Sequence, residues 1–407
     1  MDVPTLRTDF PILEREINGH PLVYFDNAAT SQTPEPVLEA MNAYYRTYNS
    51  NVHRGIHQLS QEASIAYEEA HDRVAEFINA PEGRPEIVFT KNATEAMNLL
   101  ASGWGRPTLG AGDEIVLTEM EHHASLVTWQ QLAAETGATV RYIPITADGR
   151  LDMAAARELI GPDTAVVSVV HVSNTLGTIN PVTELSALAH DHDALVVVDG
   201  AQSVPTRPVD VQALGADALV FSGHKMCGPT GIGVLWARRS LLESMAPYQY
   251  GGEMIRKVTF EAAEWNELPW KFEAGTPPIA EAIGLAAACE YLADEVGMER
   301  LAAHERRLAT AAYERLSAAD DIEVYGPPGP ERGGLVAFNL AGVHAHDLSS
   351  IVNDYGVAIR AGDHCTQPLH DVLGVGASAR ASFYLYNTMA ELEQLEVAID
   401  AARDLFG

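Results

Sequence analysis

Two short apolar runs, each followed by polar residues, constrain this chain more than any other feature. The runs are Ala194–Val198 and Ala218–Phe221, and their continuous apolar character is typical of buried strands in an α/β sheet. Strand-like and helix-like segments alternate from about residue 85 to residue 240, which predicts a largely parallel sheet with helices on both faces. The sequence therefore predicts an α/β fold built around these two strands.

The polar residues after the two runs carry the chemistry. Asp199 and Gln202 follow the first run, and Ser222, His224 and Lys225 follow the second. Open sheets bind ligands at such strand ends. A lysine that binds an aldehyde covalently, beside an acid that pairs with a ring nitrogen, suits pyridoxal 5'-phosphate. The alternative is a surface lysine at a loop tip, which is disfavoured because the chain has only four lysines and this one lies in S-G-H-K.

The segments D-G-A-Q and S-G-H-K-M-C-G-P-T-G-I-G resemble the class V aminotransferase family of fold-type I enzymes. Within that family the chain resembles SUF-type (group II) cysteine desulfurases and selenocysteine lyases, from Tyr24 in Y-F-D-N-A-A-T to Arg380 in R-A-S-F-Y-L-Y-N. The resemblance implies a large cofactor-binding domain over residues 22–290, with a mostly parallel seven-stranded sheet. It implies a smaller α+β domain from residues 1–21 and 291–407, and a homodimer.

The residues around the cofactor follow from chemistry and from this resemblance. A buried Asp199 would keep the ring nitrogen protonated; the alternative is an aspartate that caps a turn. His122 is expected to stack on the ring and to move protons, although a lone histidine is usually structural. The resemblance implies that Gln202 and Asn174 form hydrogen bonds with the phenolic oxygen of the cofactor. It also implies phosphate contacts from Thr94, Glu95, Ser222, His224 and, across a subunit interface, Thr276.

Two arginines are candidates for the carboxylate of an amino-acid substrate. Arg360 and Arg380 both lie near predicted strand ends, and an arginine can bind a carboxylate through two hydrogen bonds. The motif R-A-S-F-Y-L-Y-N assigns this role to Arg380 by resemblance. Weaker candidates for lining the substrate site, for which a turn or a surface charge is the alternative, are Asn27, Ala28, His53, Arg54 and Asn174.

The three cysteines distinguish the functions within the family. Cys289 lies in an alanine-rich helical segment and is expected to be buried, and the resemblance places a bulkier structural residue at Cys227. Cys365 lies in the polar loop R-A-G-D-H-C-T, where nearby cationic groups such as Arg360 favour a reactive thiolate. By resemblance Cys365 is the nucleophile. The family loop commonly has histidine where this chain has Asp363, which adds a negative charge near the thiol.

The predicted function is a cysteine desulfurase that converts L-cysteine to L-alanine and leaves a persulfide on Cys365. Lys225 is expected to remove the α-proton, and the sulfur is expected to reach a SUF-type acceptor or scaffold protein for iron–sulfur cluster assembly. A lyase acting on L-selenocysteine, or an aminotransferase, would use the same pocket, but an aminotransferase would have no use for Cys365. A non-enzymatic scaffold would be expected to lack Lys225 or Asp199. No metal is expected, because C-x-x-C and H-E-x-x-H are both absent.

The net charge of −30 over 407 residues sets the expected surroundings. It disfavours binding to nucleic acid or to an anionic membrane, and no apolar run approaches the roughly 20 residues of a membrane span. The first residues lack the pattern of a signal peptide, and three widely spaced cysteines argue against a disulfide framework. We therefore expect a cytoplasmic protein. Scarce lysine together with the charge favours adaptation to high salt over an ordinary acidic surface.

We expect the melting temperature to rise by several degrees between low and molar KCl, because ions screen the repulsion among the carboxylates. Thermal unfolding followed by circular dichroism across a KCl series measures this, and NaCl at equal ionic strength is the control. A melting temperature that stays constant would refute the salt adaptation and would leave the predicted function untouched.

Overall fold

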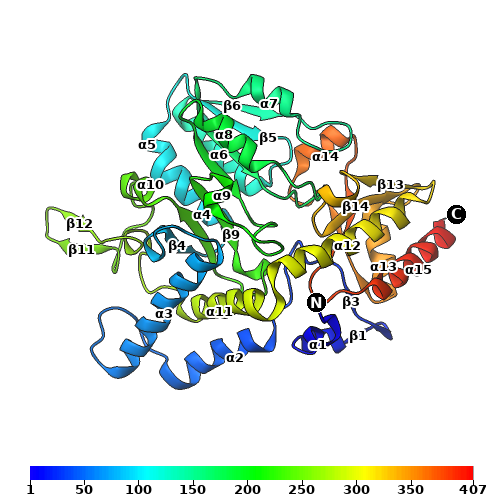
Figure 1. Ribbon diagram of the computed structural model, residues 1–407, viewed down its shortest axis with the longest axis horizontal. Coiled ribbons are helices and arrows are strands. Elements are labelled where there is room, and N and C mark those ends of the chain that lie inside the picture. Colours follow the sequence, from blue (N-terminus) through cyan, green and yellow to red (C-terminus); the bar gives the residue numbers. More distant parts are fainter. Residues whose placement is uncertain (407) are drawn as a thin grey trace.

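The computed structural model describes residues 1–406 and is built on two main sheets flanked by helices (Figure 1). The larger sheet has the strand order β4 (Ile87–Thr90), β10 (Gly233–Ala237), β9 (Ala218–Ser222), β8 (Leu195–Asp199), β7 (Thr164–Val170), β5 (Glu114–Thr118) and β6 (Thr139–Ile143). Strand β10 is antiparallel to both of its neighbours, and the other neighbouring strands are parallel. The expected seven-stranded, mostly parallel sheet is confirmed.

Nine helices within the described residues are eight or more residues long. They are α2 (Glu35–Ala43), α3 (Gln58–Phe77), α4 (Ala93–Leu100), α6 (His123–Thr136), α8 (Val182–His190), α11 (Ile279–Glu290), α12 (Met298–Ser317), α13 (Ala345–Asp354) and α15 (Met389–Phe406). Shorter helices are α1 (Val3–Arg7), α5 (Arg106–Thr108), α7 (Met153–Leu159), α9 (Val211–Leu214), α10 (Arg239–Ser244) and α14 (Gln367–Leu373). Within residues 1–406, none of the helices has the length and apolar character needed to cross a membrane.

Side-chain alternation along β8 explains why helices cover both faces of the large sheet. Val196 and Val198 belong to a buried cluster that includes side chains of α3, α8 and α11. Val197 points the other way, into a cluster with side chains of α4, α6 and α10. All three valines are fully buried. A strand that is apolar on both faces is stable only in the middle of such a sandwich.

The smaller sheet has four antiparallel strands in the order β13 (Ile322–Tyr325), β14 (Leu335–Leu340), β17 (Ser378–Ser382) and β16 (Arg360–Gly362). It shares a third buried cluster with side chains of α12, α13 and α15. Val23 and Phe25 belong to this cluster too, and β3 (Val23–Tyr24) pairs in parallel with β15 (Val357–Ala358). The N-terminal segment therefore packs against the C-terminal part of the chain, while the proposed domain boundaries stay a prediction.

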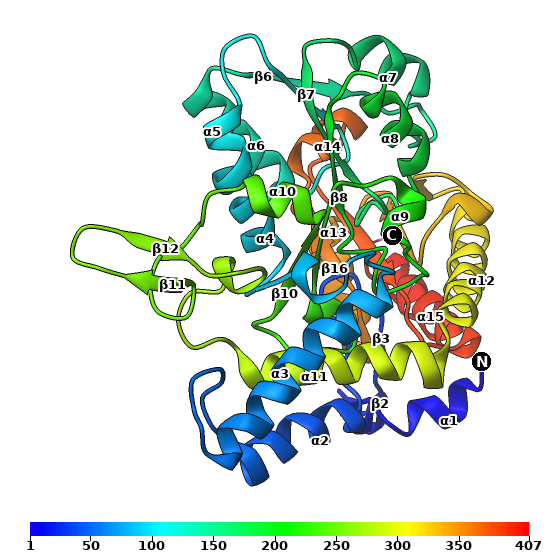
Figure 2. The same ribbon diagram turned by 60° about the vertical axis from the view of Figure 1, so that its left-hand side comes forward.

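Two features of the structure do not follow from the local pattern of the sequence. The short segment Val357–Arg360 takes part in two strands, because β15 and β16 pair with different sheets and one straight strand cannot pair with both. The segment after Pro247 contains a hairpin of β11 (Ile255–Val258) and β12 (Ala263–Trp265), which projects from the body (Figure 2). Both hairpin strands are largely exposed. A strand with no buried face lacks the apolar alternation by which strands are recognised.

Arg332 joins the turn before β14 to the large sheet. Its side chain is fully buried, and its Nη1 donates to the carbonyl oxygens of Leu176 and Leu335, both at 3.1 Å. Nη2 donates to Tyr325 O at 2.7 Å and Nε to Pro327 O at 2.9 Å. Burial lowers the pKa of Arg332 to about 10. One guanidinium thus satisfies four buried carbonyl groups, one of which belongs to the loop after β7.

Replacing Arg332 with Met should lower the free energy of unfolding by about 3 kcal/mol or more, because four buried acceptors lose their donor. Guanidinium denaturation followed by fluorescence measures the loss. Arg239→Met is the matched control, since its half-exposed guanidinium pairs only with surface glutamates and its loss should leave the free energy of unfolding nearly unchanged. Equal effects of the two substitutions would contradict the bracing role of Arg332.

Candidate active site

A cavity of about 440 Å³ opens between the carboxyl ends of the parallel strands and the loop after β16. Its walls come from segments that are far apart in the sequence, on both main sheets. Residues predicted for the site that line this cavity are Ala28, Thr94, His122, Asn174, Asp199, Gln202, Ser222, His224, Lys225, Arg360, Cys365 and Arg380.

Lys225 and Asp199 are brought to the cavity by the two central strands. Asp199 is the last residue of β8, and Lys225 ends the short turn Gly223–Lys225 that follows β9. Burial lowers the pKa of Lys225 to about 8, against the opposing effect of the Asp199 charge. Burial raises the pKa of Asp199, while a hydrogen bond from Ala201 N to its Oδ1 at 2.9 Å and the charge of Lys225 oppose that rise. The pair therefore places an amine that can lose its proton near neutral pH close to a carboxylate.

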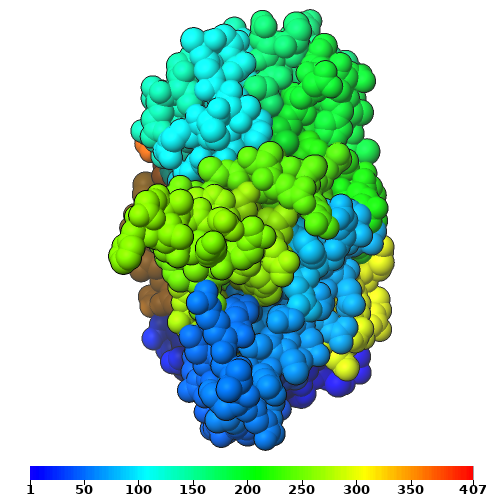
Figure 3. All heavy atoms as spheres, turned by 90° about the vertical axis from the view of Figure 1, so that its left-hand side faces the viewer, coloured from blue at the N-terminus to red at the C-terminus, as the bar shows by residue number. Residues whose placement is uncertain are grey.

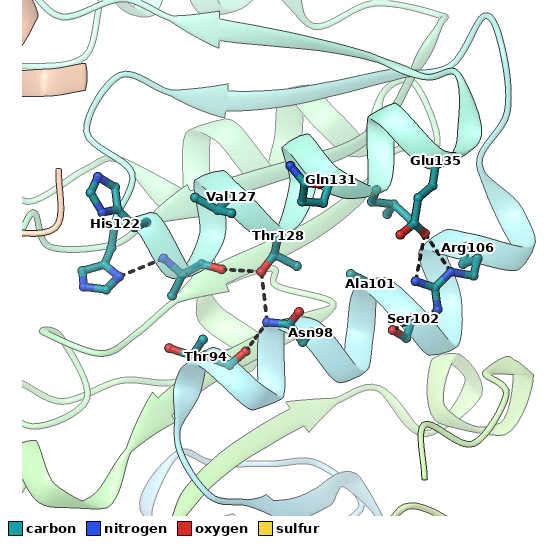
Figure 4. A pocket seen from close by; sticks show the side chains of 13 residues that line it. Thr94, Asn98, Ala101, Ser102, Arg106, His122, Val127, Thr128, Gln131 and Glu135 are labelled. Atoms are coloured by element: carbon teal, nitrogen blue, oxygen red, sulfur yellow. Dashed lines mark hydrogen bonds and ion pairs between the residues drawn. The ribbon is translucent and has the colours of Figure 1, made fainter. Parts of the chain in front are cut away.

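His122 forms the N-cap of α6, where its Nδ1 accepts a hydrogen bond from Ala124 N at 3.0 Å. Figure 4 shows this ring at the end of a neighbouring groove of about 460 Å³ between α4 and α6. Burial, with the nearby charge of Lys225, lowers the pKa of His122 to about 3. At neutral pH His122 is therefore an uncharged planar ring at the cavity wall, and this suits stacking on a heteroaromatic ligand.

The start of α4 provides N–H groups at one end of the cavity. Asn92 caps the helix, because its Oδ1 accepts from Glu95 N at 2.9 Å. Ser222 Oγ accepts from Ala93 N at 2.9 Å, and its own hydrogen remains available to a ligand. Gly233 lets β10 approach closely, since a Cβ there would lie 2.4 Å from Asn92. Hydroxyl groups and a helix N-terminus together fit a phosphate.

Three residues of the cavity wall each have a buried polar atom without a partner within the described residues. The atoms are Oδ1 of Asn174, Nε of Arg380 and Nδ1 of His364. The first two belong to side chains that contact each other's surroundings. Both side chains are held from behind: Arg380 Nη1 donates to Asn174 O at 2.8 Å, and Asn174 Nδ2 donates to His364 O at 2.7 Å. Unpaired buried polar atoms are costly. An acceptor and a donor left free side by side indicate a polar ligand.

The donors and acceptors present therefore fit pyridoxal 5'-phosphate and an amino acid. An amine, a carboxylate, an amide, hydroxyl groups and a helix N-terminus match the aldehyde, ring nitrogen, phenolic oxygen and phosphate of that cofactor. Lys271 has a lowered pKa as well, caused by burial. However, its Nζ donates to two backbone carbonyls, at Leu242 and Glu243. Lys225 is not tied to the backbone in this way.

Asp26 is a part of the site that the sequence analysis missed. Its carboxylate binds Arg360 through three hydrogen bonds, Nε to Oδ1 at 3.0 Å, Nε to Oδ2 at 3.2 Å and Nη2 to Oδ2 at 2.7 Å. Arg380 Nη2 lies 3.6 Å from Asp26 Oδ1. The hydrogen bond with Asp26 raises the pKa of Arg360, whereas burial lowers that of Arg380 to about 10. The signal was its place directly before Asn27 in the small-residue turn D-N-A-A-T.

Five predicted residues do not line the cavity. Asn27 is enclosed by its own hydrogen bonds, donating to Ser382 O at 2.6 Å. His53 packs on Trp270, with ring centroids 4.5 Å apart. Arg54 pairs with Glu253 at 3.4 Å. The remaining two, Glu95 and Thr276, line a separate pocket of about 410 Å³.

The three cysteines differ sharply in their surroundings. Cys365 is exposed, and Cys227 and Cys289 are buried. Burial raises the pKa of Cys227 to about 12 and raises that of Cys289 further. Asp363 has a structural task in the Cys365 loop, because its Oδ1 accepts from Cys365 N at 3.0 Å. The aspartate that departs from the family pattern thus caps the turn that carries the thiol.

His123, also missed by the sequence analysis, holds this loop at two points. Its backbone N–H donates to Cys365 O at 2.8 Å, and its Nε2 accepts from Gln367 N at 3.0 Å. The adjacent His122 lies in the cavity wall. The histidine pair therefore connects the wall formed by α6 to the loop of Cys365.

Comparison with known proteins gives consistent matches over the whole chain. The family model Aminotransferase class-V matches residues 23–395. A protein of Haloferax volcanii named "Cysteine desulfurase" is 65% identical over 418 residues, which cover 100% of this chain and 98% of that protein. A "Probable cysteine desulfurase" of Halobacterium salinarum is 64% identical, with 100% and 98% covered. The structure "Apo structure of Cysteine Desulfurase from Thermococcus onnurineus NA1" has a TM-score of 0.92 at 42% identity, covering 99% of this chain and 98% of that one.

Brief treatment with iodoacetamide at about pH 8 should modify Cys365 at least about 100-fold faster than the other two cysteines. Cys227 and Cys289 are buried, and each unit of raised pKa lowers the thiolate fraction tenfold. Mass spectrometry of the three peptides measures the rates, and the same reaction in guanidinium should label all three alike. Rapid labelling of Cys227 in the folded protein would contradict the burial of its thiol.

Proposed function

The chain belongs to the class V aminotransferase family, and we propose that it is a cysteine desulfurase that takes sulfur from L-cysteine onto Cys365 and releases L-alanine. One observation carries this proposal. The exposed thiol of Cys365 lies in the wall of the same cavity as Lys225 and Asp199. The full-length matches to cysteine desulfurases support the same reaction.

The cofactor of this reaction would be pyridoxal 5'-phosphate, which when bound supplies an electron sink for the α-carbon of the substrate. Lys225 would hold its aldehyde and Asp199 its ring nitrogen. His122 would stack on the ring, and Gln202 with Asn174 would contact the phenolic oxygen. The phosphate would bind to Thr94, Ser222 and His224 at the start of α4.

Lys225 serves as the base for the α-proton. Because burial lowers its pKa to about 8, a useful fraction of the amine is neutral at neutral pH and can accept a proton. Arg380 binds the substrate carboxylate, since its Nε is free and its Nη1 is anchored on Asn174 O. Arg360, oriented by Asp26, adds a second positive charge to the same wall.

Cys365 takes the sulfur atom. Its thiolate attacks the thiol sulfur of the substrate, a new S–S bond forms, and the bond between that sulfur and the β-carbon breaks. The electron pair of the broken bond stays with the carbon fragment, which takes up protons to become L-alanine. Cys365 is left as a persulfide and, being exposed, can pass the outer sulfur to a SUF-type acceptor for iron–sulfur cluster assembly.

The active form would be a homodimer. In one chain Thr276 lies outside the cavity, in the pocket that it shares with Glu95. The phosphate contact that the resemblance implies for Thr276 would therefore be made by a second copy of the chain. The nearby hairpin exposes Val258 and Phe260, and the segment before it exposes Tyr250 (Figure 3 faces this side of the molecule). Large apolar side chains gathered on one side are typical of an interface. A monomer measured by light scattering would contradict this assembly.

Replacing Cys365 with Ala should lower sulfide release from L-cysteine at least about 100-fold while the cofactor absorbance stays, because Lys225, Asp199 and His122 are intact. The assay quantifies sulfide and alanine together in the presence of a reductant. Without reductant, one turnover of the parent enzyme should add one sulfur to the peptide that contains Cys365.

Control variants separate this function from its relatives. Cys227→Ala and Cys289→Ala should retain most of the activity, and Lys225→Ala should release neither sulfide nor alanine. If Cys365→Ala works on cysteine at the parent rate, the persulfide mechanism is wrong. Selenide release that survives Cys365→Ala would then favour a selenocysteine lyase. The 2-oxo acid of cysteine, 3-mercaptopyruvate, as the main product would favour an aminotransferase.

A further inference from the structure

The loop that carries Cys365 has an unusual backbone. His364 and Cys365 have φ angles of 50° and 57°, in the left-handed region that residues other than glycine rarely adopt. Such a conformation persists only where surrounding contacts hold it. Asp363 holds the N–H of Cys365 and Asn174 holds the carbonyl of His364. These two contacts hold the backbone of the loop.

A single hydroxyl group lies beneath the loop and bridges two histidines. Ser378 Oγ is 3.0 Å from Nε2 of His364 and 3.0 Å from Nε2 of His370. His364 precedes Cys365, and His370 lies in α14, which follows the loop. Ser378 begins β17 and pairs with Gly362, the last residue before the loop. All three side chains of this bridge are buried, so water does not compete for its hydrogen bonds.

The direction of each hydrogen in the bridge follows from its neighbours. Thr366 Oγ1 lies 2.9 Å from Asp363 O, which can only accept, and 2.8 Å from Thr175 Oγ1, whose hydroxyl can donate to it. Both contacts are satisfied when Thr366 donates to Asp363 O and accepts from Thr175. His370 Nδ1 lies 3.2 Å from Thr366 O and 3.4 Å from Thr366 Oγ1, so Nδ1 faces two acceptors and must carry a hydrogen. In the neutral ring, Nε2 of His370 is then an acceptor. Ser378 therefore donates to His370.

His364 completes the chain as a donor. With its hydrogen given to His370, Ser378 Oγ accepts from Nε2–H of His364. Burial lowers the pKa of His364 to about 2, so the ring is neutral and its Nδ1 carries no hydrogen. That Nδ1 has no donor partner within the described residues. The chain is directed from His364 through Ser378 to His370, and reversing it would leave a buried N–H without an acceptor.

We propose that Ser378, backed by His370, is a positioning residue for Cys365 in the desulfurase reaction. The bridge pins His364, and through the next peptide bond it fixes the direction of the Cys365 thiol toward the substrate cavity. Neither Ser378 nor His370 lines that cavity, so the two act through the loop. The inference rests on the proposed role of Cys365 as the sulfur acceptor.

The test compares two reactions of the same thiol in the holoenzyme. Persulfide formation in a single turnover with L-cysteine requires the thiol to be aimed at the bound substrate. Alkylation by iodoacetamide only requires it to be accessible from solvent. Loss of the bridge should therefore slow persulfide formation at least about tenfold, since small misplacements of a reacting group greatly lower the rate. The same loss should speed alkylation by iodoacetamide severalfold.

Four variants carry the test. Ser378→Ala removes the bridge, and His370→Leu removes the acceptor that orients it. His370→Gln keeps an acceptor oxygen at a similar reach and should restore most of the persulfide rate. Ser186→Ala is the matched control, because Ser186 is a buried serine whose hydroxyl has no partner, and both rates should stay at the parent values. If Ser378→Ala is insoluble, His370→Leu and His370→Gln decide.

Opposite changes of the two rates, with cofactor absorbance retained, support the positioning role. Unchanged rates overturn it. A fall in both persulfide formation and alkylation overturns it too, because such a fall would mean that less of the Cys365 thiol is ionised, not that the thiol points away from the substrate. The parent enzyme and Cys365→Ala are measured in parallel. If Cys365→Ala still releases sulfide, the proposed function fails. If it does not, and Ser378→Ala equals the parent, only the positioning role fails.

Discussion

The structure depends on the burial of β8 and β9 in the centre of the large sheet, where every residue of the two strands except Leu195 is buried. Their apolar side chains are removed from water on both faces of the sheet. Each Å² of apolar surface removed from solvent contributes about 25 cal/mol to the stability of the fold. Polar residues are then tolerated only where the strands end, and Asp199 and Lys225 lie there. The same burial lowers the pKa of Lys225 to about 8 and raises the pKa of Asp199. Stability of the sheet and reactivity of the site thus have one cause.

The two sheets meet around the cavity through hydrogen bonds. Arg380 of β17 donates to Asn174 O in the loop after β7, and Asn174 donates back to His364 O. His123, at the start of α6, holds Cys365 O. Hydrogen bonds are directional, so they fix where the Cys365 loop stands relative to Lys225 more closely than apolar packing would.

The electrostatics of the cavity contrast with those of the whole chain. The protein carries 56 acidic side chains against 26 lysines and arginines. Even so, Lys225, Arg360 and Arg380 gather in one cavity wall with Asp26 paired to the arginines. Asp199 and Asp363 line the cavity as well, so its charge is mixed. The lysine and the two arginines form a basic part of its wall, which attracts an anionic group such as a carboxylate.

The sequence by itself determined the fold class and the place of Asp199 and Lys225, because apolar runs indicate buried strands and polar strand ends converge at one sheet edge. The number of strands and most other residues of the cavity wall followed from the resemblance to a known family. It did not reveal the β11–β12 hairpin, whose exposed strands lack an apolar face. Nor did it reveal Asp26 beside Arg360, or Ser378 between two histidines, because each contact joins residues from different elements. Spacing along the chain specifies what one element presents. Which side chains meet across elements is decided only by how the elements pack, and this packing alone sets the direction of the Cys365 loop.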